Sequence, residues 1–392
     1  MKVTYDVMVG DNRETIKSLP DQSVNTVVTS PPYFGLRDYG TGKWVGGDPE
    51  CNHMRDTKFN EGATTGHKAM GKTNNAVGDS IYKNECDKCG AVREDSQFGL
   101  EETPEEFCDN LVKLFREIRR VLKDDGTVWL NLGDSYAGSG KNRNADGSSN
   151  EKGIEGTKQG TSQGTILGDL RPVKAHEIGL KPKDLIGIPW MVAFALRADG
   201  WYLRQDIIWS KPNPMPESVK DRCTKAHEYI FLLSKSKNYY YDYEAIREPA
   251  AYDGRKDEQL KGSPKYADAD IMPNGKPNSL ASSGHARWNK DKDGNRVRNK
   301  RSVWTVPPKP FKGAHFATYP PELIEPCILA GCPVGGTVLD PFGGSGTTAG
   351  VAYLHDRNSI LCELNPEYAE LVERRIEGII EGKRTLGATL PI

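Results

Sequence analysis

The sequence is short of apolar residues for a chain of 392 residues, with 36% hydrophobic residues and a mean hydropathy of −0.64. No apolar run approaches the roughly 20 residues that cross a membrane. The amino terminus MKVTYDVMVGD also lacks the pattern of a signal peptide. We therefore expect a cytoplasmic protein with no membrane partner. In that compartment the eight cysteines are not expected to form disulfides, and clustered ones indicate metal ligands.

A net positive charge is also missing, because 53 Lys and Arg residues face 54 Asp and Glu residues. Any surface that binds nucleic acid must then come from local segregation of charge. The length allows one elaborated domain or two domains. The low apolar content predicts that long polar insertions interrupt the core.

Strand and helix patterns alternate at both ends of the chain, which predicts a doubly wound α/β fold with a mostly parallel sheet. The best-defined helix pattern follows Thr103-Pro104 and ends near Asp124–Gly126. Periodicity is lost in three polar stretches, 41–99, 136–175 and 246–302, which we interpret as insertions at loops. The remaining segments follow: strands within 3–10, 23–30, 126–134, 201–211, 228–236, 337–342 and 359–365, and helices within 185–200, 320–331, 347–356 and 366–380.

The strand pattern at residues 24–29 stops at Ser30-Pro31-Pro32-Tyr33. Two prolines cannot donate to a sheet ladder, and they fix the backbone just beyond the strand. In an open α/β sheet ligands bind at this end of a strand. A serine hydroxyl, a proline carbonyl and a tyrosine ring suit a flat molecule that carries an amino group. Taken alone, the motif is equally consistent with an ordinary exit from a strand.

A second strand runs into the glycine-rich turn Asp340-Pro-Phe-Gly-Gly-Ser-Gly-Thr-Thr348 and then into a helix. Such a turn lets a ligand lie against the backbone and over the helix amino terminus. The turn has no lysine, which excludes the phosphate-binding G-x-x-x-x-G-K-[ST] loop. Glu363 ends the next strand, 20 residues beyond Gly343, where an acid can accept hydrogen bonds from ribose hydroxyls. The combination predicts a nucleoside-type cofactor.

The pair TSPPY and DPFGGSGTT, in this order, resembles the S-adenosylmethionine-dependent DNA amino-methyltransferases of the β-class. That family methylates N4 of cytosine or N6 of adenine. The resemblance implies a Rossmann-like, circularly permuted sheet of seven strands. It covers about residues 3–40, 103–135, 184–245 and 303–380. We predict a catalytic domain made of residues 1–40, 100–245 and 303–392, with a flexible loop at 136–175.

The resemblance also implies roles for individual residues. Ser30 and Pro31 would accept the hydrogens of the amino group, with Pro32 fixing the backbone, and Tyr33 would stack on a base flipped out of double-stranded DNA. Serine at this position favours N4 of cytosine. Adenine N6, an RNA substrate and a non-catalytic nucleic-acid-binding protein remain as alternatives. The implied S-adenosylmethionine residues are Asp11, Thr29, His315, Asp340, Phe342, Gly343, Gly344, Ser345, Gly346, Thr347, Glu363 and Asn365.

Four metal-ligand residues lie in the insertion 41–99, as Cys51-x-His53 and Cys86-x-x-Cys89-Gly. Three thiolates and an imidazole form the ligand set of a structural zinc site. The span between them has few apolar residues, so a metal would explain how it folds. His67 competes with His53 as the fourth ligand, and free thiols in an unstructured insertion are the alternative.

A basic stretch in the region 246–302 occupies the place of a target-recognition region in β-class enzymes. Basic side chains suit phosphates and base edges, and a tryptophan among them can stack or wedge. The alternative is a solvated charged loop. The candidate DNA contacts are Arg287, Trp288, Lys290, Arg296, Arg298, Lys300 and Arg301.

The sequence leaves the oligomeric state open, a homodimer included.

Overall fold

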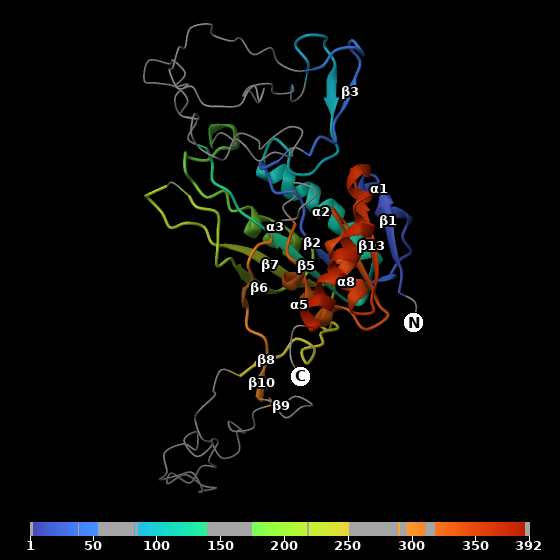
Figure 1. The fold of residues 1–392 in the computed structure, drawn as a ribbon. Coiled ribbons are helices and arrows are strands. Elements are labelled where there is room, and N and C mark those ends of the chain that lie inside the picture. Colours follow the sequence, from blue (N-terminus) through green and yellow to red (C-terminus); the bar gives the residue numbers. More distant parts are fainter. Residues whose placement is uncertain are drawn as a thin grey trace, which may run out of the picture.

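A computed structural model describes residues 3–37, 39–53, 82, 85–138, 175–217, 219–250, 289–290, 296–309 and 318–388. Its centre is an eight-stranded sheet in which only β7 runs antiparallel to its neighbours (Figure 1). The predicted α/β, mostly parallel sheet is therefore confirmed. It has eight strands instead of seven, because the short strand β11 pairs with β6 at the edge. The order is β1 (Tyr5–Val9), β13 (Asn358–Glu363), β12 (Thr337–Asp340), β2 (Val24–Thr29), β5 (Leu122–Leu132), β7 (His227–Ser234), β6 (Tyr202–Ser210) and β11 (Val303–Thr305).

Helices cover both faces of this sheet, because successive side chains of a strand point to opposite faces. In β2, Val27 belongs to the core under one helical layer and Val28 to the core under the other. Trp129 of β5 shares the core of Val28, while its neighbours Val128 and Leu130 share that of Val27. One layer contains α1 (Asn12–Thr15), the 3₁₀ helix η1 (Ile16–Ser18), α2 (Pro104–Val121) and α3 (Ile188–Ala198); the other contains α5 (Pro321–Gly331), α6 (Thr347–Leu354) and α8 (Val372–Ala388).

The start of α2 follows the predicted capping, since the Glu106 amide donates to Thr103 Oγ1 at 3.1 Å. Its end differs from the prediction. The helix stops at Val121, because Leu122 already pairs with Val24 as the first residue of β5. The helix expected at 366–380 is also two helices, α7 (Pro366–Ala369) and α8.

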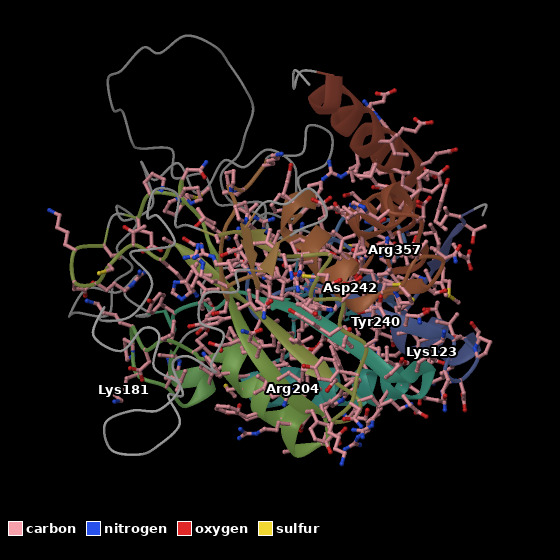
Figure 2. The ribbon with its side chains drawn as sticks, turned by 90° about the horizontal axis from the view of Figure 1, so that it is seen from below. Lys123, Lys181, Arg204, Tyr240, Asp242 and Arg357 are labelled. Atoms are coloured by element: carbon pink, nitrogen blue, oxygen red, sulfur yellow. The ribbon has the colours of Figure 1, made fainter. Side chains whose placement is uncertain are left out.

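The chain closes the sheet at the amino-terminal ends of its parallel strands, where Figure 2 labels several of the residues involved. The amide of Tyr240 donates to the Asp125 carbonyl at 2.8 Å, and that of Asp242 donates to the Ala330 carbonyl at 2.9 Å. The buried Arg357 donates to the Cys332 carbonyl at 3.1 Å. The pocket described below lies at the opposite, carboxyl-terminal ends of the parallel strands. Among the described residues no helix is long and apolar enough to cross a membrane.

Two small sheets lie outside the large one. β3 (Lys43–Val45) and β4 (Val92–Glu94) form an antiparallel hairpin in the insertion, and Figure 1 shows β3 well away from the large sheet. A three-stranded sheet in the region 246–302 was not predicted, because strands of two or three residues show no periodicity. Its strands, in spatial order, are β8 (Glu248–Pro249), β10 (Arg296–Arg298) and β9 (Asn289–Lys290). Elsewhere in the chain a further 3₁₀ helix, η4, spans Ala175–Ile178.

Candidate active site

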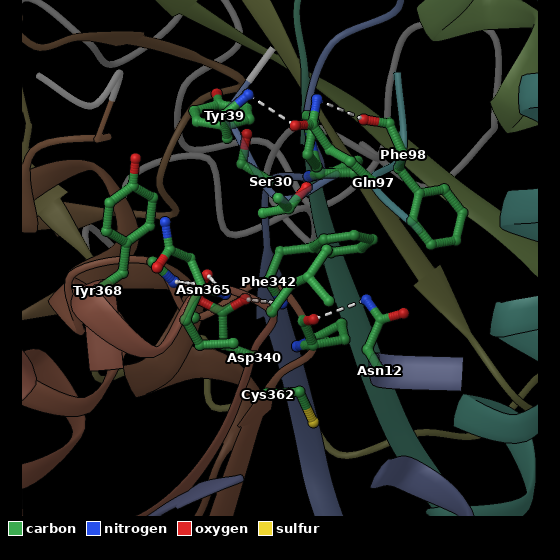
Figure 3. Close-up of a pocket in the computed structure, with 18 of the residues that line it drawn as sticks. Asn12, Ser30, Tyr39, Gln97, Phe98, Asp340, Phe342, Cys362, Asn365 and Tyr368 are labelled. Carbon is green, nitrogen blue, oxygen red and sulfur yellow. Dashed lines mark hydrogen bonds between the residues drawn. The ribbon is translucent and has the colours of Figure 1, made fainter. Parts of the chain in front are cut away.

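A pocket opens at the carboxyl ends of β1, β2, β12 and β13 (Figure 3). Each strand contributes the residue at or just after its end: Asp11, Ser30, Asp340 and Glu363. The two motifs meet because β2 and β12 are neighbours in the sheet, with Val27 opposite Leu339. The fold thus joins segments that are about three hundred residues apart in the sequence.

The glycine turn forms the floor of this pocket. Its backbone is tied to β13, because the Gly343 amide donates to the Cys362 carbonyl at 2.8 Å. A side chain at Gly343 would lie 2.8 Å from Leu361 Cβ, so the sheet admits only glycine there. Ser345 lines the pocket, and its buried hydroxyl has no hydrogen-bond partner among the described residues. This unpaired hydroxyl is suited to a polar ligand.

Asp340 anchors the turn from below. It is 1% exposed and accepts hydrogen bonds from the hydroxyls of Thr29 (2.6 Å), Tyr319 (2.9 Å) and Thr348 (2.5 Å) and from the Phe342 amide (3.1 Å). Burial raises its pKa, although these donors oppose the shift. Thr29 therefore lies behind Asp340 and does not line the pocket. Gly346, the other predicted cofactor residue in the described part of the chain that does not line it, packs against Val372.

Glu363 joins the turn to the segment after β13. One carboxylate oxygen accepts from the Gly344 amide at 2.7 Å and the other from the Asn365 amide at 2.8 Å. Each oxygen keeps a second acceptor position for a ligand. Burial raises the pKa of Glu363 to about 7. The acid predicted to bind a ribose thus lines the pocket with both oxygens already oriented.

The Ser-Pro-Pro-Tyr motif forms another side of the pocket, where Ser30 is half-buried. Tyr33 Oη donates to Glu228 Oε2 at 2.6 Å, and Glu228 also pairs with Lys211. Burial, followed by the charge of Glu228, raises the pKa of Tyr33 well above its ordinary value, so the phenol stays protonated. The ring lies against Gly133, where an added Cβ would be 2.4 Å from Tyr33 Cε2.

Further lining residues had no signal in the sequence pattern. Figure 3 shows Tyr39, Gln97 and Phe98 on one side of the pocket, from segments that flank the β3–β4 hairpin. Asn12 supports the turn, because its side-chain amide donates to the Pro341 carbonyl at 2.8 Å. These residues come from irregular loops or a one-turn helix, where periodicity carries no information. Tyr319 belongs to the predicted segment 315–320, whereas His315 lies outside the described residues.

The four predicted metal ligands come together. All of their ligand atoms lie within 4.8 Å of one another. Cys51 Sγ and Cys86 Sγ are 3.8 Å apart, and Cys89 Sγ is 3.5 Å from His53 Nδ1. A zinc–sulfur distance of about 2.3 Å gives a tetrahedron with an S···S edge of about 3.8 Å, so the cluster has the spacing of a zinc site. The competing ligand His67 lies outside the described residues.

The predicted DNA contacts are described in part. Arg298 Nε and Arg301 Nε both donate to Glu248 Oε1, at 2.9 Å and 2.6 Å, and Lys300 lies over the Trp304 ring at 5.1 Å. Partial burial acts to raise the pKa of Glu248, but the two arginines outweigh it and lower this pKa overall. Arg287 and Trp288 lie outside the described residues, and Lys290 and Arg296 are placed only by their backbone in β9 and β10.

A doubly wound sheet that presents a glycine turn, an acidic strand end and a Ser-Pro-Pro-Tyr motif around one pocket resembles the S-adenosylmethionine-dependent methyltransferases, and a pocket at the strand ends is where such sheets bind ligands. The profile of the DNA methylase family matches residues 24–374. The chain therefore belongs to this family, the S-adenosylmethionine-dependent DNA amino-methyltransferases.

Curated relatives match over almost the whole chain. The Type II methyltransferase M.SmaI of Serratia marcescens is 39% identical over 370 residues, which are 94% of this chain and 90% of the relative. The Type II methyltransferase M.Cfr9I of Citrobacter freundii is 38% identical over 369 residues, 94% of this chain and 86% of the relative.

Two solved structures also resemble the chain. The PvuII DNA methyltransferase (cytosine-N4-specific) has a TM-score of 0.49 and 16% identity, over 97% of this chain and 93% of its own. A putative DNA modification methylase of Thermus thermophilus, complexed with S-adenosyl-L-methionine, has a TM-score of 0.48 and 19% identity, over 97% of this chain and 96% of its own.

Proposed function

We propose that this DNA amino-methyltransferase methylates N4 of cytosine at a specific site in double-stranded DNA, with N6 of adenine as the alternative. The observation that carries the proposal is Ser30, which faces the same pocket as the glycine turn and Glu363. Serine at this position of the motif resembles the cytosine-N4 enzymes of the family. Both named relatives are Type II methyltransferases, which supports site specificity and a pairing with a restriction enzyme.

The cofactor fits the residues that line the pocket. Glu363 offers two oriented carboxylate oxygens to ribose hydroxyls, and Ser345 offers a buried hydroxyl with no partner among the described residues. The turn leaves backbone atoms free of side chains at Gly343 and Gly344, close to the amino terminus of α6. S-adenosylmethionine, when bound, supplies a methyl group already activated by its sulfonium.

The acceptor must be made more nucleophilic and held in place. The lone pair of an exocyclic amino group is delocalised into the base, so the nitrogen attacks poorly. The Ser30 hydroxyl and the Pro31 carbonyl would accept hydrogen bonds from the two N–H groups of the amino nitrogen. These bonds would favour a tetrahedral nitrogen whose lone pair points toward the methyl group. Positioning of this kind supplies much of the rate.

The base must leave the duplex to reach the site, and Tyr33 would hold it there. Glu228 fixes the phenol of Tyr33 and is itself paired with Lys211, so the ring has a defined position before DNA binds. Serine is not a plausible general base, and the surplus proton would leave to solvent after transfer.

Arg298, Lys300 and Arg301 are proposed to contact DNA from the region 246–302. Glu248 holds both arginines on the same oxygen, which keeps two positive charges side by side. Such a pair matches adjacent phosphate oxygens.

The acceptor base can be identified directly. DNA from cells that express the protein would be digested to nucleosides for mass spectrometry and read by long-read sequencing, which reports the base type and the motif together. We expect N4-methylcytosine within one short sequence. N6-methyladenine without N4-methylcytosine would disprove the cytosine assignment, and methylation of neither would disprove catalysis.

We further propose that Cys51, His53, Cys86 and Cys89 bind one structural zinc ion. Support comes from the ligand atoms, which all lie within 4.8 Å of one another, and from the Cys86–Gly90 turn, where the Gly90 amide donates to the Cys86 carbonyl at 2.7 Å. Gly90 has a φ of 72°, a left-handed conformation that suits glycine. Metal analysis of the purified protein should find one zinc per chain, and a folded, active, zinc-free preparation would reject the site.

A further inference from the structure

One wall of the cofactor pocket belongs to the polar insertion and not to the sheet. Residues 36–37 and 39–41 precede β3 and residues 96–98 follow β4, and members of both segments line the pocket. The pocket therefore depends on how these two segments, here called the two arms, are held together.

Hydrogen bonds join the arms beside the pocket. The Tyr39 amide donates to Gln97 Oε1 at 2.7 Å (Figure 3). Gln97 Nε2 donates to the Arg37 carbonyl at 2.8 Å, so this side chain spans the gap between the arms. Phe98 then packs edge-on against Phe342 of the glycine turn, with ring centroids 5.3 Å apart. The arms thus contact the turn that would hold the cofactor.

The same pairing continues away from the pocket. Thr41 Oγ1 donates to Asp95 Oδ1 at 2.7 Å, and Asp95 also forms a buried ion pair with Arg93 at 2.7 Å. β3 and β4 follow, with Trp44 opposite Arg93. Cys51 and His53 follow β3 in the chain, Cys86 and Cys89 precede β4, and the Trp44 ring stacks on His53 at 4.4 Å between centroids.

The described part of the hairpin has little apolar core to hold the arms without a metal. Its buried apolar residues are Tyr82, Cys86 and Ala91, with Trp44 packed against them, so the cluster is small and contains a proposed ligand. A region with so little apolar burial needs another source of stability, and a bound metal can provide it.

We propose that the metal at this cluster clamps the two arms and thereby sets the affinity of the pocket for S-adenosylmethionine. The inference rests on the proposed zinc site and on the cofactor assigned to the family. Without the metal, the large sheet and the glycine turn keep their own contacts. The wall formed by Tyr39, Gln97 and Phe98 loses its fixed spacing, and the cofactor binds more weakly.

The test uses the full-length protein. Zinc would be counted by mass spectrometry, removed with a chelator and returned, and the affinity for S-adenosylmethionine would be measured by calorimetry in each state. We expect at least a tenfold weaker affinity without zinc and recovery when zinc is restored. Far-UV circular dichroism should show that the helices and the sheet persist.

A matched pair of variants supports the experiment. Cys89→Ser removes one ligand and should weaken cofactor binding, whereas Cys223→Ser replaces an exposed cysteine outside the cluster and should not. Zinc loss that leaves the affinity within twofold would overturn the clamp while the metal site stands. Absence of zinc from a protein that binds the cofactor tightly would overturn both, while the methyltransferase assignment stands.

Discussion

The position of the Tyr33 ring depends on the absence of a side chain at Gly133. We predict that Gly133→Ala lowers the rate of methyl transfer by about 10- to 100-fold, because displacing a positioning group by about 1 Å has costs of this size. An added Cβ would lie 2.4 Å from Tyr33 Cε2, so the ring, whose phenol donates to Glu228, would have to shift. Single-turnover kinetics would measure the effect.

The affinity of the Gly133→Ala variant for S-adenosylmethionine should stay unchanged. Gly378→Ala is the matched control, since nothing lies within 4 Å of the added Cβ there. A variant at Gly133 with a normal rate would show that the position of Tyr33 is not needed for transfer.

A second residue, Glu363, should make cofactor binding depend on pH. Its raised pKa, about 7, means that the carboxyl gains a proton as the pH falls through neutrality. A protonated carboxyl offers fewer acceptor positions to ribose hydroxyls. We therefore expect the dissociation constant to rise about tenfold between pH 8 and pH 6, since each pH unit below the pKa reduces the carboxylate form about tenfold.

Calorimetry at several pH values would measure this dependence. Glu363→Gln keeps the shape but does not titrate, so its weaker binding should be flat over the same range. A wild-type profile that is equally flat would exclude Glu363 as the titrating ligand.

At the scale of elements, Glu248 of the edge strand β8 pairs with Arg298 of the central strand β10 and with Arg301, which follows the small sheet in the chain. Arg301 is 68% exposed in its side chain and Arg298 29%, so Arg301 is the better placed to reach a phosphate. We predict that Arg301→Ala weakens DNA binding on all sequences and reduces the salt dependence by about one phosphate contact.

Fluorescence anisotropy with labelled duplexes at several salt concentrations would test this prediction. Lys17→Ala is a suitable control. Lys17 lies in η1, outside the small sheet, and is an exposed cation that pairs with Glu14. Equal effects of both variants would point to general electrostatics in place of a contact at Arg301.

The helices and strands differ in how well the sequence predicts them. The pattern of α2 predicts its start because Thr103 and Pro104 act locally. Its end is set by the pairing of Leu122 with Val24, a residue 98 positions away, so no local signal could give it. The strands β8 to β10 are short and gain their order from one another, which explains why the sequence predicted no strands in the region 246–302.

At the scale of the whole molecule, the pocket links the two ends of the chain. Asn12 contacts the Pro341 carbonyl, and Ser30 and Glu363 line the same pocket, so a ligand there would contact both halves of the permuted fold. We predict that S-adenosylmethionine at 100 times its dissociation constant stabilises the protein by about 2.7 kcal/mol at 25 °C.

Equilibrium unfolding in denaturant with and without the cofactor would measure this gain. Glu363→Gln should show a smaller gain at the same cofactor concentration because it binds more weakly. No gain for the wild type would mean that the cofactor binds the unfolded chain equally well or does not bind the pocket.

The sequence by itself determined the chemistry of the two motifs, the alternation of strands and helices, and the Cys₃His set, because each depends on residue types at short spacing. Only the tertiary structure decided what lies around them. It placed Glu228 and Gly133 against Tyr33 and set Thr29 behind Asp340. It also brought the arms of a polar insertion to the cofactor pocket. These contacts join residues far apart in the chain, and loop segments without periodicity leave no trace of them in the sequence.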